Sequence, residues 1–484
     1  MASYLASRFP TILPSFDPVP NPFKLVALVN RRQWMFFSVK SLYFSYPIGF
    51  VAWTWDAFDF FTVAMTVTDL SETFGKTREE ITWGITITLM FRSVGSIIFG
   101  ILSDRYGRKW PFIANNMLFI VFELATGFCQ TFTQFLVTRA FYGIAMGGIY
   151  GNAAATALED APEAARGLLS GMMQQGWSFG FLFATIFARA LVNTTSYGWR
   201  PLFWFGACPP VLFIIARLLM PETNVYQQRA AVRAEMDSPG KVFFKEGKVA
   251  LKKHWMLLIY MTMLMAGFNF MSHGSQDLYP TLLKSQFDLS ANQVTVTQVV
   301  ANLGAILGGL VAGYTSQIFG RRFSILWTCV IGGTLLYPYT FVSNERVMVA
   351  AFFEQFCVQG AWGVIPIHLM ELAPPSLRTF VVGTAYQLGN LVSSASATIE
   401  ATIGQRFPLP SKVVNGKIVT HFNYGLVMCI FMACVYVYVI FLTFLGPEKR
   451  SRPMDIQEDD EILPTKEAEL NNTNSGQPTK TEHV

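Results

Sequence analysis

The sequence predicts an all-α polytopic membrane protein with twelve transmembrane helices in two six-helix bundles. Three observations lead to this prediction. The 484 residues are 52% hydrophobic and only 14% charged, and 44 of them are Phe, a composition typical of chains that lie in a bilayer. Twelve apolar stretches are each long enough to cross a hydrocarbon core of ~30 Å as a helix. The last six stretches repeat features of the first six.

The apolar stretches fall in two sets. The first covers about 44–66, 81–103, 111–129, 133–158, 167–192 and 200–220. The second covers about 255–284, 292–318, 323–343, 346–372, 378–404 and 421–446. We therefore predict a bundle over 44–220 and another over 255–446. Helices are expected because nothing in the sequence resembles the alternating strands of a barrel, the other structure that satisfies its backbone in lipid.

The polar segments complete the organisation. We expect residues 1–43 to be a cytosolic segment with an interfacial helix, 221–254 a cytosolic linker, and 447–484 a disordered cytosolic tail, acidic and poor in aromatics. Basic runs such as "RYGRK" and "EKRSR" fall on one side of the predicted membrane. The positive-inside rule makes that side cytosolic, with both termini inside. The tail is a candidate contact for cytosolic trafficking machinery.

Several function classes are disfavoured. The six cysteines have no metal-ligand or redox spacing, and we find no nucleophile–base set or phosphate loop. We therefore expect neither an enzyme, nor a metal site, nor a cofactor. The net charge of +5 does not indicate nucleic-acid binding, because the basic residues cluster in short loops. The expected surroundings are a lipid bilayer, a small-molecule substrate and protons.

The chain repeats itself at an offset of 212 or 213 residues. "GILSDRYGRK" (100–109) matches "GYTSQIFGRR" (313–322), "EDAPEAARG" (159–167) matches "ELAPPSLRT" (371–379), and each half ends in Pro-Glu. Two related bundles around one axis suit alternating access at their interface.

The run "GILSDRYGRK" resembles the signature of the major facilitator superfamily, and the resemblance covers roughly residues 44–446. It implies the major facilitator fold. We expect its residues to latch a gate between conformations: Gly100, Asp104, Arg105, Gly107, Arg108 and Lys109. Asp104 can pair with cations or cap a helix end. The second copy has Gln317 and Ile318 in place of the acid and the base, which favours the first copy as the latch.

Charged groups occur at membrane depth in the first bundle. Asp56 and Asp59 are three residues apart and share a helix face. Arg92 precedes Gly100 by eight residues, about 12 Å along a helix, and so lies near mid-membrane. Its guanidinium fits either a substrate carboxylate or one of these two acids, and both interpretations stay open.

Three further charged residues lie in apolar surroundings. Arg139 enters the fourth span, either as an interfacial anchor or, as the superfamily resemblance implies, as a residue linked to coupling. For Glu123 and Glu400 we expect a helix-end or otherwise satisfied carboxyl.

The stretch "NFMSHGSQDLYPT" (269–281) is the counterpart of the first span. Asn269, His273 and Asp277 step by four, with Gln276 beside them, and so form one polar stripe on a helix. His273 and Asp277 can hydrogen-bond, an arrangement suited to moving a proton. The alternative is an internal network that fixes packing; four such groups on one face favour a transport path.

This stretch also resembles the seventh-span signature of the fungal Jen-type carboxylate/proton symporters, in a group that includes sialate/proton symporters. The match includes Asn269, Ser272, His273, Gln276 and Asp277. The resemblance implies proton-coupled uptake of lactate or pyruvate, or of dicarboxylates such as malate or succinate, across a plasma membrane. It also implies roles in substrate and proton handling for the Asn, His and Asp of the signature and for Arg92.

Two glutamines match between the halves, Gln175 in "GMMQQGW" and Gln387 in "GTAYQLGN". We favour substrate contact for both over interhelical bonding. The hypothesis is a carboxylate:proton symporter in which Arg92 holds the anion and Asn269, His273, Gln276, Gln175 and Gln387 contribute to its binding. His273 and Asp277 carry the proton, with Asp56 or Asp59 as the alternative. A sugar-acid symporter and a non-transporting nutrient sensor are the rival hypotheses.

Overall fold

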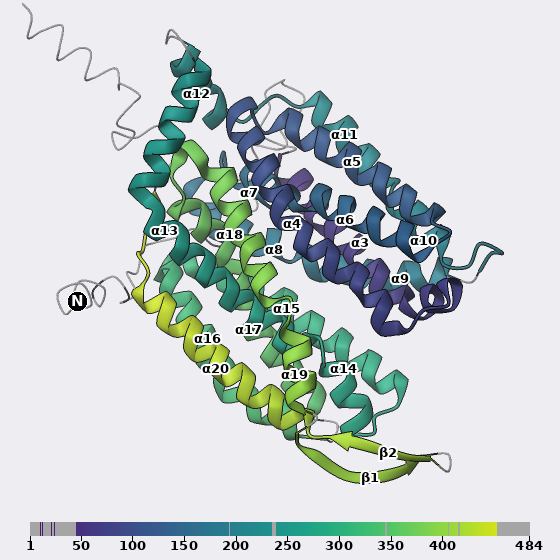
Figure 1. Ribbon diagram of the computed structural model, residues 1–484. Coiled ribbons are helices and arrows are strands. Elements are labelled where there is room, and N and C mark those ends of the chain that lie inside the picture. The colour runs from purple at the N-terminus through teal and green to yellow at the C-terminus, as the bar shows by residue number, and fades with distance from the viewer. Residues whose placement is uncertain are drawn as a thin grey trace, which may run out of the picture.

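The computed structural model describes residues 45–192, 194–234, 239–343, 346–404, 406–414 and 417–452, with a few isolated positions before them. Its helices form two groups that lie side by side (Figure 1). The first helix group comprises α3 (Ser45–Phe74), α4 (Arg78–Tyr106), α5 (Lys109–Phe128), α6 (Phe132–Gly147), α7 (Ile149–Leu158), α8 (Arg166–Gln174), α9 (Gly176–Leu191), α10 (Arg200–Gly206) and α11 (Pro209–Leu219). The second comprises α13 (Pro239–Gln276), α14 (Tyr279–Thr281), α15 (Ala291–Phe319), α16 (Arg321–Phe341), α17 (Val347–Leu372), α18 (Arg378–Ser393), α19 (Ser396–Gly404) and α20 (Tyr424–Leu445).

Each predicted apolar stretch is helical, but several are broken. Helices α6 and α7 are separated at Gly148, α8 and α9 at Gln175, and α10 and α11 just before Pro209. Proline lacks the backbone N–H that an uninterrupted helix needs, which accounts for the last break. Seven helices of the described chain are long and apolar enough to cross a membrane.

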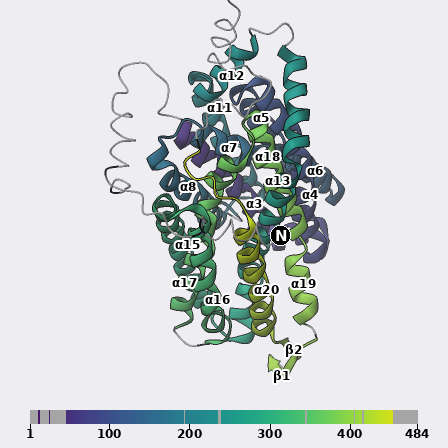
Figure 2. The ribbon, with the colours of Figure 1, turned by 90° about the vertical axis from the view of Figure 1, so that its left-hand side faces the viewer.

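The segments between and around the helices differ in part from expectation. The predicted linker contains α12 (Asn224–Ala234) and the first turns of α13. A hairpin of β1 (Pro408–Val414) and β2 (Lys417–Phe422), which the sequence did not predict, joins α19 to α20 at the end of the molecule away from α12 (Figure 2). The predicted interfacial helix before residue 44 lies outside the described residues, as does the predicted disordered tail from residue 453 onward. The first residues of that predicted tail, 447–452, are described and make hydrogen bonds to the helix groups.

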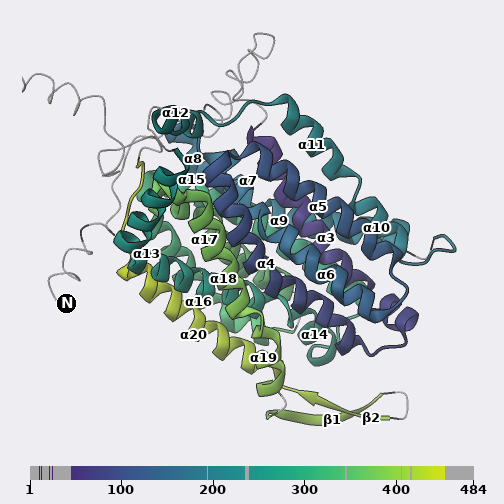
Figure 3. The ribbon, with the colours of Figure 1, turned by 45° about the horizontal axis from the view of Figure 1, so that its top comes forward.

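The two groups meet along a limited set of helices. From the first group α4, α7 and α8 pack against α15, α17 and α18 of the second, and Figure 3 shows α18 beside α4. Gly100 lies on this interface. A Cβ atom added there would lie 2.6 Å from Cα of Phe380, so a side chain at this position would push α4 away from α18.

Polarity is inverted relative to a soluble protein. Large apolar side chains such as Trp83, Leu219 and Met256 are exposed, whereas Arg92 and Arg139 are almost completely buried. Water would oppose this distribution, but a lipid environment favours it. The candidate site is therefore inside the bundle, among the buried charges.

Candidate functional site

The Gly100–Lys109 motif marks one end of the molecule, which we call the motif end. Near the end of α4, the carboxylate of Asp104 accepts hydrogen bonds from the backbone N–H groups of Thr379 (3.2 Å) and Phe380 (2.8 Å). These N–H groups belong to the first turn of α18, where a negative charge is favoured by the helix dipole. Asp104 therefore caps a helix of the opposite group.

The second copy of the motif lacks this bridging cap. Its Gln317 accepts a hydrogen bond from Arg321 (2.7 Å) in its own helix group and donates one to Ser451 (3.3 Å) in the segment that follows α20. The substitution of the acid noticed in the sequence thus corresponds to a different bonding pattern. Of these two equivalent residues, Asp104 is the one whose side chain hydrogen-bonds to the opposite helix group.

A buried ion-pair network surrounds the cap. Arg108 donates two hydrogen bonds to Glu159, at 3.1 and 2.6 Å, and lies 3.1 Å from Asp104. Arg378 of the second group lies 3.8 Å from Glu159. Burial alone raises the pKa of Glu159, but the guanidiniums of Arg108 and Arg378 and the hydroxyl of Thr223 lower it below its ordinary value of 4.5. Glu159 is therefore a fixed anion held by cations from both groups.

The repeat places an equivalent ion pair in the second group. Arg321 donates to Glu371 through two nitrogens, each at 3.0 Å. The Pro-Glu pairs also act alike. Glu222 accepts from the backbone N–H of Lys109 (2.9 Å), and Glu448 accepts from that of Arg321 (3.3 Å). Each carboxylate thus stabilises the start of a helix.

The segment 448–452, which we call the strap, connects both groups at the motif end. The backbone N–H of Ser451 donates to Glu371 (3.1 Å), and Arg450 donates to the carbonyl of Ile318 (2.9 Å). Arg166 of the first group donates to the carbonyl of Arg452 (3.0 Å). The motif end is therefore closed by side chains from α4, α8, α18 and the strap.

Deeper in the first group, Arg92 and Asp56 form an ion pair. Nη2 of Arg92 donates to Oδ2 of Asp56 at 3.0 Å, and both side chains are fully buried. The other two guanidinium nitrogens of Arg92 have no hydrogen-bond partner in the described part of the chain. The ion pair that the sequence left open is thus present, and Arg92 keeps unused donors for an anion.

A second buried charge cluster lies beside this pair. Arg139 donates to Glu123 at 3.2 Å, and its guanidinium carbon lies 3.9 Å from the centre of the Tyr142 ring. Arg139 is 1% exposed, so its interpretation as an interfacial anchor was wrong; the buried Glu123 holds it inside the bundle. Asp59 belongs to this cluster rather than to Arg92: both Glu123 and Arg139 act on it electrostatically.

The second group contributes the polar stretch 269–281. Nδ1 of His273 lies 3.1 Å from Asp277, and Nε2 lies 3.3 Å from Oδ1 of Asn390 on α18. Arg92 acts electrostatically on His273, which brings this stretch and the first-group ion pair into one region. The side chains of His273 and Asp277 are 17% and 39% exposed, whereas the side chain of Arg92 is fully buried.

The remaining predicted site residues are engaged in different ways. Asn269 donates to the carbonyl of Met265 in its own helix, and Gln276 donates to Gln355 of α17 at 2.8 Å. Gln175 packs against Gly309 of α15, at the boundary between the groups. Gln387 is buried, its side-chain amide has no partner among the described residues, and Ser93 beside Arg92 donates to its backbone carbonyl.

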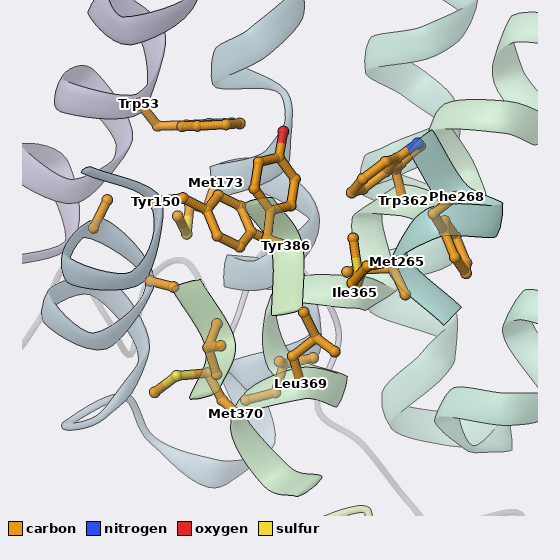
Figure 4. Packing of buried hydrophobic residues seen from close by; sticks show 14 of the residues in the cluster. Trp53, Tyr150, Met173, Met265, Phe268, Trp362, Ile365, Leu369, Met370 and Tyr386 are labelled. Carbon is orange, nitrogen blue, oxygen red and sulfur yellow. The ribbon is translucent and has the colours of Figure 1, made fainter. Parts of the chain in front are cut away.

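Sequence reasoning missed an aromatic row that crosses the interface (Figure 4). Tyr150 stacks on Tyr386 with ring centres 3.9 Å apart, and Trp53 and Trp362 lie 5.7 and 5.9 Å from Tyr386. Nε1 of Trp362 donates to the hydroxyl of Ser272 in the polar stretch. The signal was present, because the offset of 212 makes Tyr150 and Trp362 equivalent positions of the repeat.

Two repeated helix groups that enclose buried charges and expose apolar side chains define a polytopic membrane protein, built on the internal repeat that many transporter folds share. The sequence model described as "Sugar (and other) transporter" matches residues 35–459. The chain belongs to this family of the major facilitator superfamily, so the predicted fold class and the superfamily resemblance are confirmed.

Individual relatives agree with this assignment. A carboxylic acid transporter protein homolog of Saccharomyces cerevisiae is 39% identical over 471 residues, covering 93% of this chain and 74% of the relative. The sialic acid transporter NanX of Escherichia coli is 23% identical, covering 83% and 92%. In fold, the proton:xylose symporter XylE has a TM-score of 0.68 at 17% identity, covering 87% of this chain and 98% of XylE.

Proposed function

We propose that this protein is a proton-coupled symporter that imports short-chain carboxylates across the plasma membrane. The observation that carries the proposal is the buried guanidinium of Arg92, which has two unused nitrogens and lies within electrostatic range of His273. Each of these free N–H groups can donate a charge-assisted hydrogen bond to a carboxylate oxygen. The 39% identity to the yeast carboxylic acid transporter homolog supports this class of substrate.

Proton coupling is supported by the charges of the first group. Asp56, Asp59 and Glu123 are three acids, and Arg92 and Arg139 are two bases, all buried. Ionisation of all five would leave one uncompensated negative charge inside the bundle, which is costly in a low-dielectric interior. One bound proton removes it. A substrate anion at Arg92 adds a further negative charge, so anion and proton favour each other's binding.

The route to Arg92 runs from the end opposite the motif. Contacts between the groups close the motif end, whereas the exposed side chain of Asp277 reaches solvent away from it. Because basic loops gather at the motif end, we assign it to the cytosol and the open end to the exterior. The substrate then meets Asp277 and His273 before it reaches Arg92.

The test is uptake into proteoliposomes that contain the purified protein. An inward proton gradient should drive accumulation of labelled lactate, with malate and sialate as unlabelled competitors that rank monocarboxylates, dicarboxylates and sugar acids. His273→Ala should abolish gradient-driven uptake. Absence of gradient-driven uptake of labelled lactate by the wild type, and of labelled malate in a parallel assay, contradicts the proposal, and binding without flux supports the rival sensor hypothesis.

A further inference from the structure

Glu400 on α19 is a buried acid that the mechanism above does not use. Its side chain is fully buried, and neither carboxyl oxygen has a hydrogen-bond partner among the described residues. The expectation that Glu400 is a satisfied or helix-end carboxyl is therefore wrong. Glu123, for which the same was expected, is held by Arg139.

The surroundings of Glu400 contain no compensating cation in the described part of the chain. Helix α19 packs against α13 and α20. Asp277 at the end of α13 acts on Glu400 electrostatically, and Glu400 in turn acts on Tyr339 of α16. Helix α20 has no charged residue in its sequence. A carboxylate here would be buried, without a partner among the described residues and beside another carboxylate, and these surroundings favour the neutral, protonated carboxyl.

Asp277 links this acid to both water and the site. Its side chain is 39% exposed and lies 3.1 Å from His273, which in turn contacts Asn390. A proton taken up from water at this end can reach Glu400 through Asp277, with an O–H bond forming on Glu400 when it arrives and breaking when it leaves. No other reactant is needed.

We propose that Glu400 is a proton-binding site of the transport cycle, working in exchange with the adjacent Asp277–His273 pair. This inference rests on the proposed symport function. It gives the second helix group its own proton carrier, separate from the acids beside Arg92. The anion at Arg92 and the proton at Glu400 then bind to opposite groups, in addition to the proton shared among the first-group acids, so that closing the groups together requires both ligands.

The test compares Glu400→Gln with a matched control, Glu354→Gln. Glu354 is also a fully buried acid of the second group, but it accepts a hydrogen bond from Tyr436 at 2.7 Å. Two transport modes are measured in proteoliposomes with labelled lactate. One is accumulation driven by a proton gradient, and the other is exchange against internal lactate at equal pH, which needs no net proton movement.

We expect Glu400→Gln to lower accumulation about 5- to 150-fold, the change in affinity that coupling between two binding sites ordinarily produces. Exchange should stay near the wild-type rate. Glu354→Gln should retain both modes. Wild-type accumulation in Glu400→Gln, or equal loss of both modes in a folded variant, overturns the inference. If the variant does not fold, Glu400→Asp replaces it: a shifted pH midpoint of accumulation supports the proposal, and an unchanged midpoint overturns it.

Proton binding is also measured without transport, which separates this inference from the proposed function. The infrared carbonyl band of a protonated carboxyl should lose intensity in Glu400→Gln relative to the wild type. An identical band in both proteins overturns the inference, whatever the uptake assays show. Failure of the wild type to transport, with the band change present, instead contradicts the symport function alone.

Discussion

Replacing Asp104 with Asn should open the motif end. The carboxylate of Asp104 receives two backbone hydrogen bonds from α18, at 3.2 and 2.8 Å, and all partners are buried or half-buried. Hydrogen bonds to a charged group contribute about 1.5–3 kcal/mol each. Asn keeps one carbonyl acceptor, so we expect the closed state to lose about 1.5–3 kcal/mol, the equivalent of one such bond.

That loss corresponds to a shift of about 10- to 150-fold in the equilibrium between closed and open motif ends. The assay is the distance distribution between spin labels on two exposed motif-end residues, Tyr106 of α4 and Lys248 of α13. The wild type should show mainly the short distance, and Asp104→Asn should add a long one. The folded state of the first group should persist, because Arg108 keeps both hydrogen bonds to Glu159.

The matched control is Glu72→Gln, which removes the same charge from an exposed position of α3. It should leave the distances unchanged. An unaltered distribution in Asp104→Asn, or the same change in both variants, would refute the reasoning that a helix cap across the groups holds the motif end closed.

Three further predictions follow from the geometry. Because folding lowers the pKa of Glu159 below its ordinary value of 4.5, ionised Glu159 stabilises the folded state above pH 4.5. This stabilisation is lost as the pH falls below 4.5. The melting temperature of the wild type should therefore drop more than that of Glu159→Gln when the pH is lowered below 4.5. Gly171→Leu should weaken closure of the motif end, since a side chain there meets the backbone of Gly309, and the same spin-label distances measure it. Arg92→Lys should weaken carboxylate binding about 10- to 150-fold in calorimetry, because one ammonium cannot both replace the bond to Asp56 and supply the free guanidinium donors, and a hydrogen bond to a charged group is worth about 1.5–3 kcal/mol.

The sequence predicted the fold class because hydrophobicity and repetition are properties of the chain itself. The predicted stretch 292–318, for example, corresponds to α15 at Ala291–Phe319. The breaks in other helices were missed, because the hydrophobicity of an apolar segment does not show whether its backbone bends. The hairpin before α20 was also missed, because its residues were counted into the following loop and span.

Pairings across the repeat were harder to predict than the residues that form them. The ion pair of Arg92 was anticipated only as one of two open alternatives, because sequence spacing cannot say which of Asp56 and Asp59 faces the guanidinium. The pair Arg139–Glu123 needs the packing of α5 against α6, which no local pattern encodes. Glu400, unlike Glu123, has no basic partner among the described residues, and no local pattern in the sequence distinguishes the two acids.

The strap sets a practical boundary for anyone who fuses or trims this chain. Helix α20 ends at Leu445, but Glu448 caps α16 and Ser451 and Arg452 bond to both helix groups. A fluorescent protein or purification tag joined directly after Leu445 would replace these contacts with linker. The same fusion placed after Arg452 leaves them in place, so comparing the two designs separates labelling artefacts from genuine loss of transport.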